Sequence, residues 1–165
     1  METMTGERAE LLGVLAQERN FLRYTVRDLT DEQAAQRTTA SELCLGGLIK
    51  HVTAAEAMWL RFVVGGAELM QSVTTDRATD FRMVAGDTLA GLLERYEQVA
   101  ANTTETIATL PDLDASHALP EAPWFEQGAR WSVRRVLLHL IGETSQHAGH
   151  ADILRESLDG QKTMG

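Results

Sequence analysis

The position of the prolines is the feature that most constrains how this chain can fold. The chain of 165 residues has only three prolines, and all of them lie in one segment, at Pro111, Pro120 and Pro123. Because proline breaks an α-helix by removing a backbone donor and crowding the preceding turn, the rest of the chain is free to form long helices. No region shows sustained alternation of apolar and polar residues, so the sequence favours an all-α fold.

Apolar residues recur at three- and four-residue steps in four parts of the chain, as they do on the buried face of a helix. The predicted helices run from about Gly6 to Asp28, from Ser41 to the Gly65-Gly66 pair, from Asp87 or Thr88 to Leu110, and from Ser132 to Asp159-Gly160. A short helical turn follows Thr30, which is a predicted N-cap. Residues 71–86 and 111–130 are long connections. The pattern predicts one domain over residues 1–165, a four-helix bundle with long crossover connections.

Charge and composition exclude several classes of partner. The chain has 15 Lys and Arg against 24 Asp and Glu, which gives a net charge of −9 with neutral histidines. Nucleic acids and anionic membrane surfaces are bound by clustered cations, and this sequence has none. No apolar stretch is long enough to span a membrane and no signal peptide is recognisable, so we expect a cytoplasmic protein. The lone cysteine, Cys44, cannot form an internal disulfide.

The last predicted helix carries polar side chains where the core of a bundle is normally apolar. Its inward stripe consists of Val136, Leu140, Glu143, His147, His150, Leu154 and Leu158. Glu143 and His147 lie about 40° apart around the helix and about 6 Å apart along its axis. His51 lies on the inward stripe of the second predicted helix, with Cys44, Leu48, Ala55, Met58 and Phe62. The sequence therefore places a histidine and a Glu-x-x-x-His pair in one predicted core.

These three residues predict a metal site. Burying an unpaired carboxylate costs several kcal/mol, and a divalent cation bound by His51, Glu143 and His147 removes that cost. Two histidines and one glutamate form a known catalytic zinc set that leaves one coordination position open. Nickel, iron or manganese is accepted by the same donors.

Simpler interpretations stay open at this point. An inward His51 can be a hydrogen-bonded core residue, and Glu143 with His147 can be an ordinary i,i+4 pair. His150 lies one turn from His147 and can replace one of the ligands. His139 follows an apolar run and can be a satisfied core residue, whereas His117 lies in the Pro-containing connection and has no predicted role.

Two segments of the sequence resemble the DinB-like (YfiT-like) family of metal-dependent helical bundles. The run His139-Leu-Ile-Gly-Glu143-Thr-Ser-Gln-His147-Ala-Gly-His150 is similar to the motif on the family's fourth helix, and Leu45-Gly-Gly-Leu-Ile-Lys-His51 is similar to the motif on its second helix. Most members of the family carry a histidine where Glu143 stands. A glutamate at this position resembles the mycothiol-dependent maleylpyruvate isomerase branch, whose zinc is held by two histidines and one glutamate.

The resemblance implies a metal-dependent thiol S-transferase. In this scheme the metal, with zinc favoured, is held by His51, Glu143 and His147, and it binds the sulfur of a small thiol such as mycothiol. The metal-bound thiolate then attacks a small electrophile. His139, His150 and Arg155 are the candidates for contacts with the ligands or the substrate. The isomerase has an additional C-terminal domain that a chain ending at Gly165 cannot contain, so we expect thiol transfer rather than that isomerisation.

A second class of function fits the same residues. The chain can be a non-catalytic metal-binding bundle, either a stress-associated binding protein or a dimerisation module, because no proton-transfer residue is evident in the sequence. A hydrolase that uses metal-bound water is a third hypothesis, which lacks an identifiable general base. The resemblance also implies a homodimer, without indicating which surface forms the interface.

Overall fold

The computed structural model describes residues 6–73 and 78–163. Its long helices are α1 (Glu7–Thr25), α3 (Leu45–Gln71), α4 (Leu89–Thr109) and α5 (Val133–Asp159). A short helix, α2 (Asp31–Ala35), follows α1, and two short strands, β1 (Ser116–Ala118) and β2 (Arg130–Ser132), pair in antiparallel register before α5. The described chain is thus mostly helical, and the prediction of an all-α bundle is confirmed.

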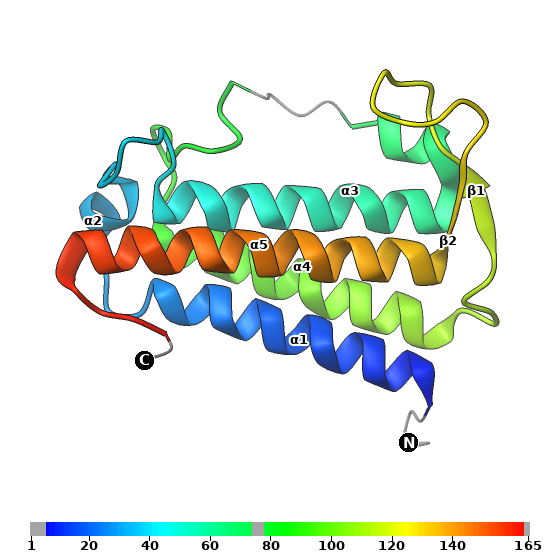
Figure 1. Cartoon of the computed structure of the whole chain (residues 1–165), viewed down its shortest axis with the longest axis horizontal. Helices are drawn as coiled ribbons and strands as arrows, with labels where there is room; N and C mark the ends of the chain where they lie inside the picture. The colour runs from blue at the N-terminus through cyan, green and yellow to red at the C-terminus, as the bar shows by residue number, and fades with distance from the viewer. Residues whose placement is uncertain (1–5, 74–77, 164–165) are drawn as a thin grey trace.

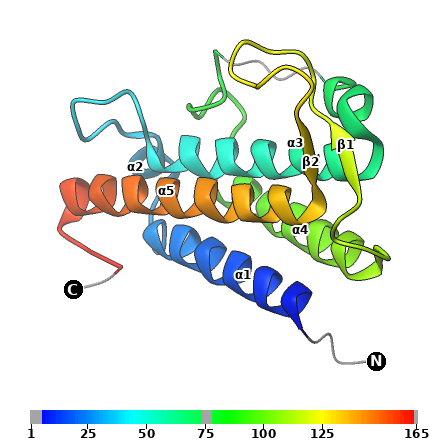
Figure 2. The same ribbon diagram turned by 45° about the vertical axis from the view of Figure 1, so that its right-hand side comes forward.

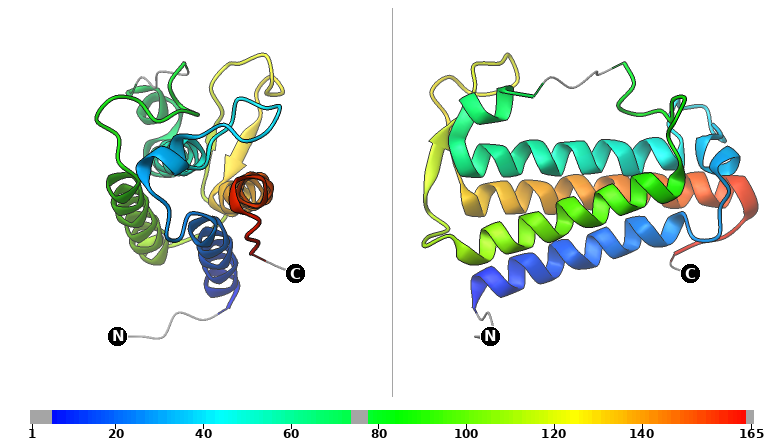
Figure 3. Two further views of the ribbon diagram at one scale, coloured as in Figure 1. Left: turned by 90° about the vertical axis from the view of Figure 1, so that its left-hand side faces the viewer. Right: turned by 180° about the vertical axis from the view of Figure 1, so that it is seen from behind.

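The four long helices pack as a bundle in which α1 contacts α5, α5 contacts α3, and α3 contacts α4 (Figure 3). Helices α3 and α4 run in the same direction, and α5 runs opposite to both (Figure 1). Because α3 and α4 are parallel, the connection between them has to return along the length of the bundle. This connection is one of the two predicted crossovers, and its residues 74–77 lie outside the described part of the chain. The connection between α4 and α5, also predicted to cross over, does not, because these two helices run in opposite directions and their connection, with β1 and β2, stays at one end of the bundle (Figure 1).

Helix ends are formed by the capping residues that the sequence contains. The Thr30 hydroxyl accepts a hydrogen bond from Gln33 N–H and the Gln33 side chain accepts one from Thr30 N–H, which forms a capping box before α2. Ser132 caps α5 by accepting from Arg135 N–H. Gly160 ends that helix with a φ of 78°, a left-handed conformation that glycine adopts without strain.

Helix α3 does not stop at the Gly65-Gly66 pair, as the sequence predicts, but bends there and continues to Gln71. Gly66 has a φ of 69°, which breaks the regular helix, and the chain resumes helical geometry after it. A Cβ atom on Gly66 would lie 3.1 Å from His117 Nδ1. His117 Nε2 also lies 3.2 Å from the carbonyl oxygen of Val63, so β1 is held against this bend.

The core consists of two apolar clusters, one at each end of the bundle. One contains Leu22, Leu48, Val52, Tyr96, Ala151 and Leu154 among others. The other contains Leu15, Trp59, Phe62, Ile107, Val136 and Leu140 among others. Along each of α1, α3 and α5, a short polar interval separates the residues of one cluster from those of the other. This middle layer of the bundle holds Arg19, Glu56, Glu143 and His147, and His51 lies next to it, one residue before Val52. No helix in the described ranges has the length and apolarity needed to span a membrane.

Candidate metal centre

The α3 and α5 helices lie side by side in opposite directions (Figure 1), and this arrangement places His51 against Glu143 and His147. His51 Nε2 lies 3.1 Å from Glu143 Oε1. His147 Nε2 lies 3.4 Å from the same oxygen. The structure thus brings together the three residues that the sequence predicts as ligands, and we refer to them as the triad.

The His51 ring is held by a side chain from outside the two helices. Phe81, in the connection between α3 and α4, stacks on the imidazole with ring centroids 3.9 Å apart and planes inclined by 22°. The His147 ring contacts the edge of His51 at a centroid distance of 4.9 Å. Because the connection returns along the bundle, it delivers Phe81 to a position at which the His51 ring is fixed with its Nε2 atom toward Glu143.

Glu143 is ionised in this environment. Hydrogen bonds from His147 and from His51 hold the pKa of its carboxyl group well below the usual range, and they outweigh the opposing effect of partial burial. The triad is not sealed, since the side chains of His51, Glu143 and His147 keep 19%, 25% and 12% of their exposure. An anionic oxygen flanked by two imidazoles is therefore accessible to a small molecule from solvent.

His150 contacts the triad at its exposed rim. Its Nδ1 atom lies 3.3 Å from His147 Nδ1, so one of these two nitrogens donates a hydrogen bond to the other. If His147 uses Nε2 as a ligand, its Nδ1 carries the proton and His150 is the acceptor. His150 is thus placed to orient His147 and not to face Glu143.

The three side chains fit a divalent cation. One candidate ligand atom from each residue lies within 4.8 Å of the other two. A carboxylate with two imidazoles is the donor set of catalytic zinc sites, and it also suits non-haem iron. Two imidazoles that share one carboxylate oxygen leave the second oxygen of Glu143 without a partner in the triad. The donor chemistry and the exposure both match a site with an open position.

His139 lies one helical turn before Glu143, on the side of the triad away from His150. Its ring contacts Trp59 at a centroid distance of 4.9 Å and Trp131 at 5.2 Å. Burial lowers the pKa of His139, although the charge of Glu143 opposes this shift. The residue therefore borders the triad while it packs among aromatic side chains.

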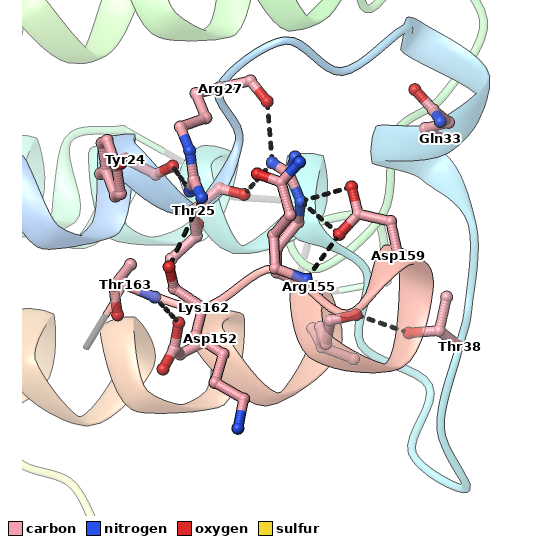
Figure 4. A network of polar contacts seen from close by, with 12 residues as sticks. Tyr24, Thr25, Arg27, Gln33, Thr38, Asp152, Arg155, Asp159, Lys162 and Thr163 are labelled. Atoms are coloured by element: carbon pink, nitrogen blue, oxygen red, sulfur yellow. Dashed lines mark hydrogen bonds and ion pairs between the residues drawn. The ribbon is translucent and has the colours of Figure 1, made fainter. Parts of the chain in front are cut away.

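Arg155 is not brought to the triad. Figure 4 shows its guanidinium bound by the carboxylate of Asp159 and by the carbonyl oxygens of Thr25 and Arg27, at distances of 2.7–3.0 Å. The side chain is almost fully buried. In place of the predicted contact with a thiol or substrate, Arg155 joins the end of α1 to the last turns of α5.

Two features around the triad were not predicted from the sequence, namely Phe81 and the Arg19–Glu56 ion pair. Phe81 lies in a connection without periodicity, so no pattern in the sequence indicates that it covers His51. Arg19 and Glu56 form a buried ion pair, with Arg19 Nη2 2.5 Å from Glu56 Oε1 and Nε 3.1 Å from Oε2. Both lie at three- or four-residue steps on the apolar stripes of their helices, and this spacing is a signal that could have identified them.

Comparison with known proteins identifies the family and the fold. The family model described as mycothiol-S-transferase matches residues 10–160. A solved structure of a conserved protein from Enterococcus faecalis has the same fold, with a TM-score of 0.73 over 96% of this chain and 100% of that chain, at 11% sequence identity. No curated protein matches the sequence significantly.

Proposed function

The chain belongs to the mycothiol-S-transferase family, and from this premise we propose that it joins mycothiol, through its sulfur, to an electrophilic small molecule at a divalent cation held by the triad. The observation that carries this proposal is the convergence of two imidazole Nε2 atoms on one carboxylate oxygen, from two different helices. An ordinary core histidine needs one hydrogen-bond partner, and it has no reason to share that partner with a second histidine.

Phe81, His150 and Glu143 prepare the site for a ligand. His51 is held by the stacked ring of Phe81 and His147 by the hydrogen bond with His150, so neither imidazole has to be ordered when a ligand arrives. Glu143 supplies a full negative charge, which offsets one of the two charges of the ion. A divalent cation held by these residues would favour the deprotonated form of an incoming thiol at neutral pH.

The partial exposure of the triad fits a site that exchanges small molecules. A structural zinc site has four protein ligands and excludes solvent, whereas a catalytic site keeps one position for water or substrate. The described residues supply three donors, so the open position is available to the thiol. Zinc is the ion we propose, because two histidines with one glutamate are one of its catalytic donor sets.

Further parts of the proposal follow the family and the sequence. We propose one domain over residues 1–165 that acts in the cytoplasm, and mycothiol as the thiol. A homodimer stays a prediction.

Metal analysis combined with a conjugation assay tests the proposal. We expect protein purified without chelators to hold about one divalent ion per chain and to form a conjugate between mycothiol and monochlorobimane. His147→Ala removes a ligand, so both the ion and the conjugation are expected to be lost. Protein without metal would contradict the proposal, and metal without turnover on any thiol would favour the non-catalytic bundle.

His117→Gln is the matched control for the loss of a histidine. His117 lies outside the triad, and glutamine keeps a donor for the carbonyl of Val63. This variant is expected to retain both the metal and the conjugating activity. If it loses both, the effect of His147→Ala reflects general destabilisation.

A further inference from the structure

A large aromatic cavity lies beside the triad, at the end of the bundle that carries the two strands. Its volume is about 800 Å³, which is in the range of small-molecule sites. The wall is formed by α3, by α5 and by the connection between β1 and β2, through Met58, Trp59, Met70, Gln71, Val73, Pro120, Glu121, Ala122, Pro123, Trp124, Phe125 and His139. Figure 2 shows this connection standing above the far end of α3.

The aromatic cavity and the triad lie along the same two helices, α3 and α5. Met58 follows His51 by seven residues, so the two side chains share a face of α3 at a separation of about 10 Å along the axis. His139 precedes Glu143 by four residues on α5, about 6 Å away along the axis. Because the two helices are antiparallel (Figure 1), both steps lead in the same direction, from the triad toward residues that line the cavity.

The rings of the wall form an aromatic cluster with Trp131, which packs against two of them without lining the cavity. Trp59 stacks on Trp131 with centroids 4.8 Å apart and planes inclined by 12°. Phe125 contacts the edges of both Trp59 and Trp131, and Trp124 contacts the edge of Phe125. Aromatic surfaces of this kind bind flat rings by offset stacking and edge contacts.

The charges of the wall select against anions. Among the described residues that line the cavity none is Lys or Arg, and Glu121 contributes a carboxylate. Burial keeps His139 neutral near neutral pH because it lowers the pKa of the imidazole. A carboxylate-bearing ligand would therefore lose hydration without a Lys or Arg among these lining residues to bind it, since the guanidinium of Arg135 lies over the ring of Trp131, which is not one of them.

We propose that the aromatic cavity is the binding site for the second substrate, and that this substrate is an uncharged electrophile built on a flat aromatic ring. The inference rests on the proposed function, which supplies the thiol. In this proposal the ring lies among Trp59, Trp124 and Phe125 with its reactive carbon toward the triad, because Met58 and His139 line the cavity on the helix faces that carry His51 and Glu143. For a chlorinated ring, the sulfur forms a bond to the ring carbon and the carbon–chlorine bond breaks. Chloride leaves with the bonding electron pair, and the thiol proton goes to solvent.

Binding can be tested without any turnover. The probes are 1,3-dinitrobenzene, which is neutral and unreactive, and 3,5-dinitrobenzoate, which adds a carboxylate to a similar ring. In ¹H–¹⁵N spectra of the metal-loaded protein, the indole N–H of Trp59 is expected to shift saturably with the neutral probe. The anionic probe is expected to bind at least about tenfold more weakly. The proposal is overturned if neither indole of Trp59 or Trp124 responds, or if both probes bind equally.

Trp124→Ala removes a wall of the cavity with little risk to folding, because the side chain is 63% exposed. The dissociation constant of 1,3-dinitrobenzene is expected to rise by about threefold to tenfold. Tyr24→Ala is the matched control, since Tyr24 is an exposed ring on α1 outside the cavity and is 50% exposed. Equal effects of the two variants would overturn the assignment.

Turnover distinguishes failure of this inference from failure of the proposed function. With mycothiol, Trp124→Ala is expected to raise the KM for 1-chloro-2,4-dinitrobenzene by about threefold to tenfold and to leave iodoacetamide, which has no ring, unaffected. Glu121→Lys is expected to improve kcat/KM for 4-chloro-3,5-dinitrobenzoate about threefold relative to the neutral ring. If the probes bind but no electrophile is conjugated, the function fails and the cavity assignment stands. If 1-chloro-2,4-dinitrobenzene and iodoacetamide are both conjugated and Trp124→Ala changes the KM for neither, the proposed function stands and only the cavity assignment fails.

Discussion

Two glutamates of α3 and α5 occupy the middle layer of the bundle, and their surroundings differ in kind. Glu56 is fully buried, and both of its oxygens accept hydrogen bonds from the guanidinium of Arg19. Glu143 keeps a quarter of its exposure and shares one oxygen between two imidazoles. The first carboxylate is neutralised by the protein itself, and the second is not.

The difference separates a structural charge from one that is available for chemistry. The guanidinium of Arg19 balances the charge of the Glu56 carboxylate and donates one hydrogen bond to each of its oxygens, so neither oxygen is left to bind a ligand. The triad has donors on three side chains and contains no permanent positive charge. A polar cluster between two helices is therefore informative about function when its charge is left for a ligand to balance.

Arg19→Met is the change with the largest expected effect on the free energy of unfolding. It leaves Glu56 as an unpaired buried charge, which costs about 3–5 kcal/mol. Urea denaturation of the metal-free protein measures this loss. Arg19→Met combined with Glu56→Leu is the control, and it is expected to recover most of the stability. A loss below about 1 kcal/mol in the single variant would mean that the Glu56 carboxylate is not left buried and unpaired when Arg19 is removed.

Glu143→Gln is expected to act on metal binding in place of stability. The amide keeps the shape and a hydrogen-bond acceptor for the histidines but loses the charge, so metal affinity is expected to fall by at least about a hundredfold. The free energy of unfolding of the metal-free protein is expected to change by less than about 1 kcal/mol. Competition with a chromogenic chelator measures the affinity. An unchanged affinity would remove Glu143 from the ligand set.

His150→Ala tests the rim of the open site. The variant removes the hydrogen-bond partner of His147 Nδ1 while it keeps all three ligands, and loss of such an orienting partner weakens metal sites by about tenfold. The same chelator competition measures it, with His150→Gln expected to restore part of the affinity. If His150→Ala abolishes binding altogether, His150 is itself a ligand.

The smallest expected effect is a pH dependence of stability in the metal-free protein. The pKa of Glu143 is lowered in the folded state from an ordinary value of 4.5, so its contribution is present above that value and is lost as the pH falls below it. The difference in unfolding free energy between wild type and Glu143→Gln should shrink between about pH 6 and about pH 3. Partial exposure keeps the whole effect below about 1 kcal/mol. A difference that is constant with pH would contradict the ionised state of Glu143.

Much of the fold could be predicted because its determinants are local. Gly160 ends α5, Ser132 begins it and Thr30 caps α2, since each of these residues acts on backbone groups within one turn. The Gly65-Gly66 pair indicated a break in α3 but not its continuation to Gln71. Whether a chain resumes a helix after a break depends on what packs against it, and here that partner is His117, more than 50 residues away.

The triad could be predicted from spacing, and its surroundings could not. Helical periodicity places His51, Glu143 and His147 on inward faces whatever the loops do. Phe81 reaches His51 only because a connection without periodicity crosses the bundle, and the two strands are too short to show alternation. The stripes also contain Arg19 and Glu56, so the same spacing rule identifies buried charges without telling which are paired. That distinction needs the relative positions of the helices.

The connection between β1 and β2 has a consequence for how this protein could diversify. It supplies about half of the residues that line the aromatic cavity, yet it contributes none of the three candidate ligands. Under the proposed function, insertions, deletions or exchanges in such a loop would change which electrophile is accepted while the two helices keep the triad in place. Selection, or a designer grafting loops from relatives, could therefore retarget the protein without rebuilding its chemistry.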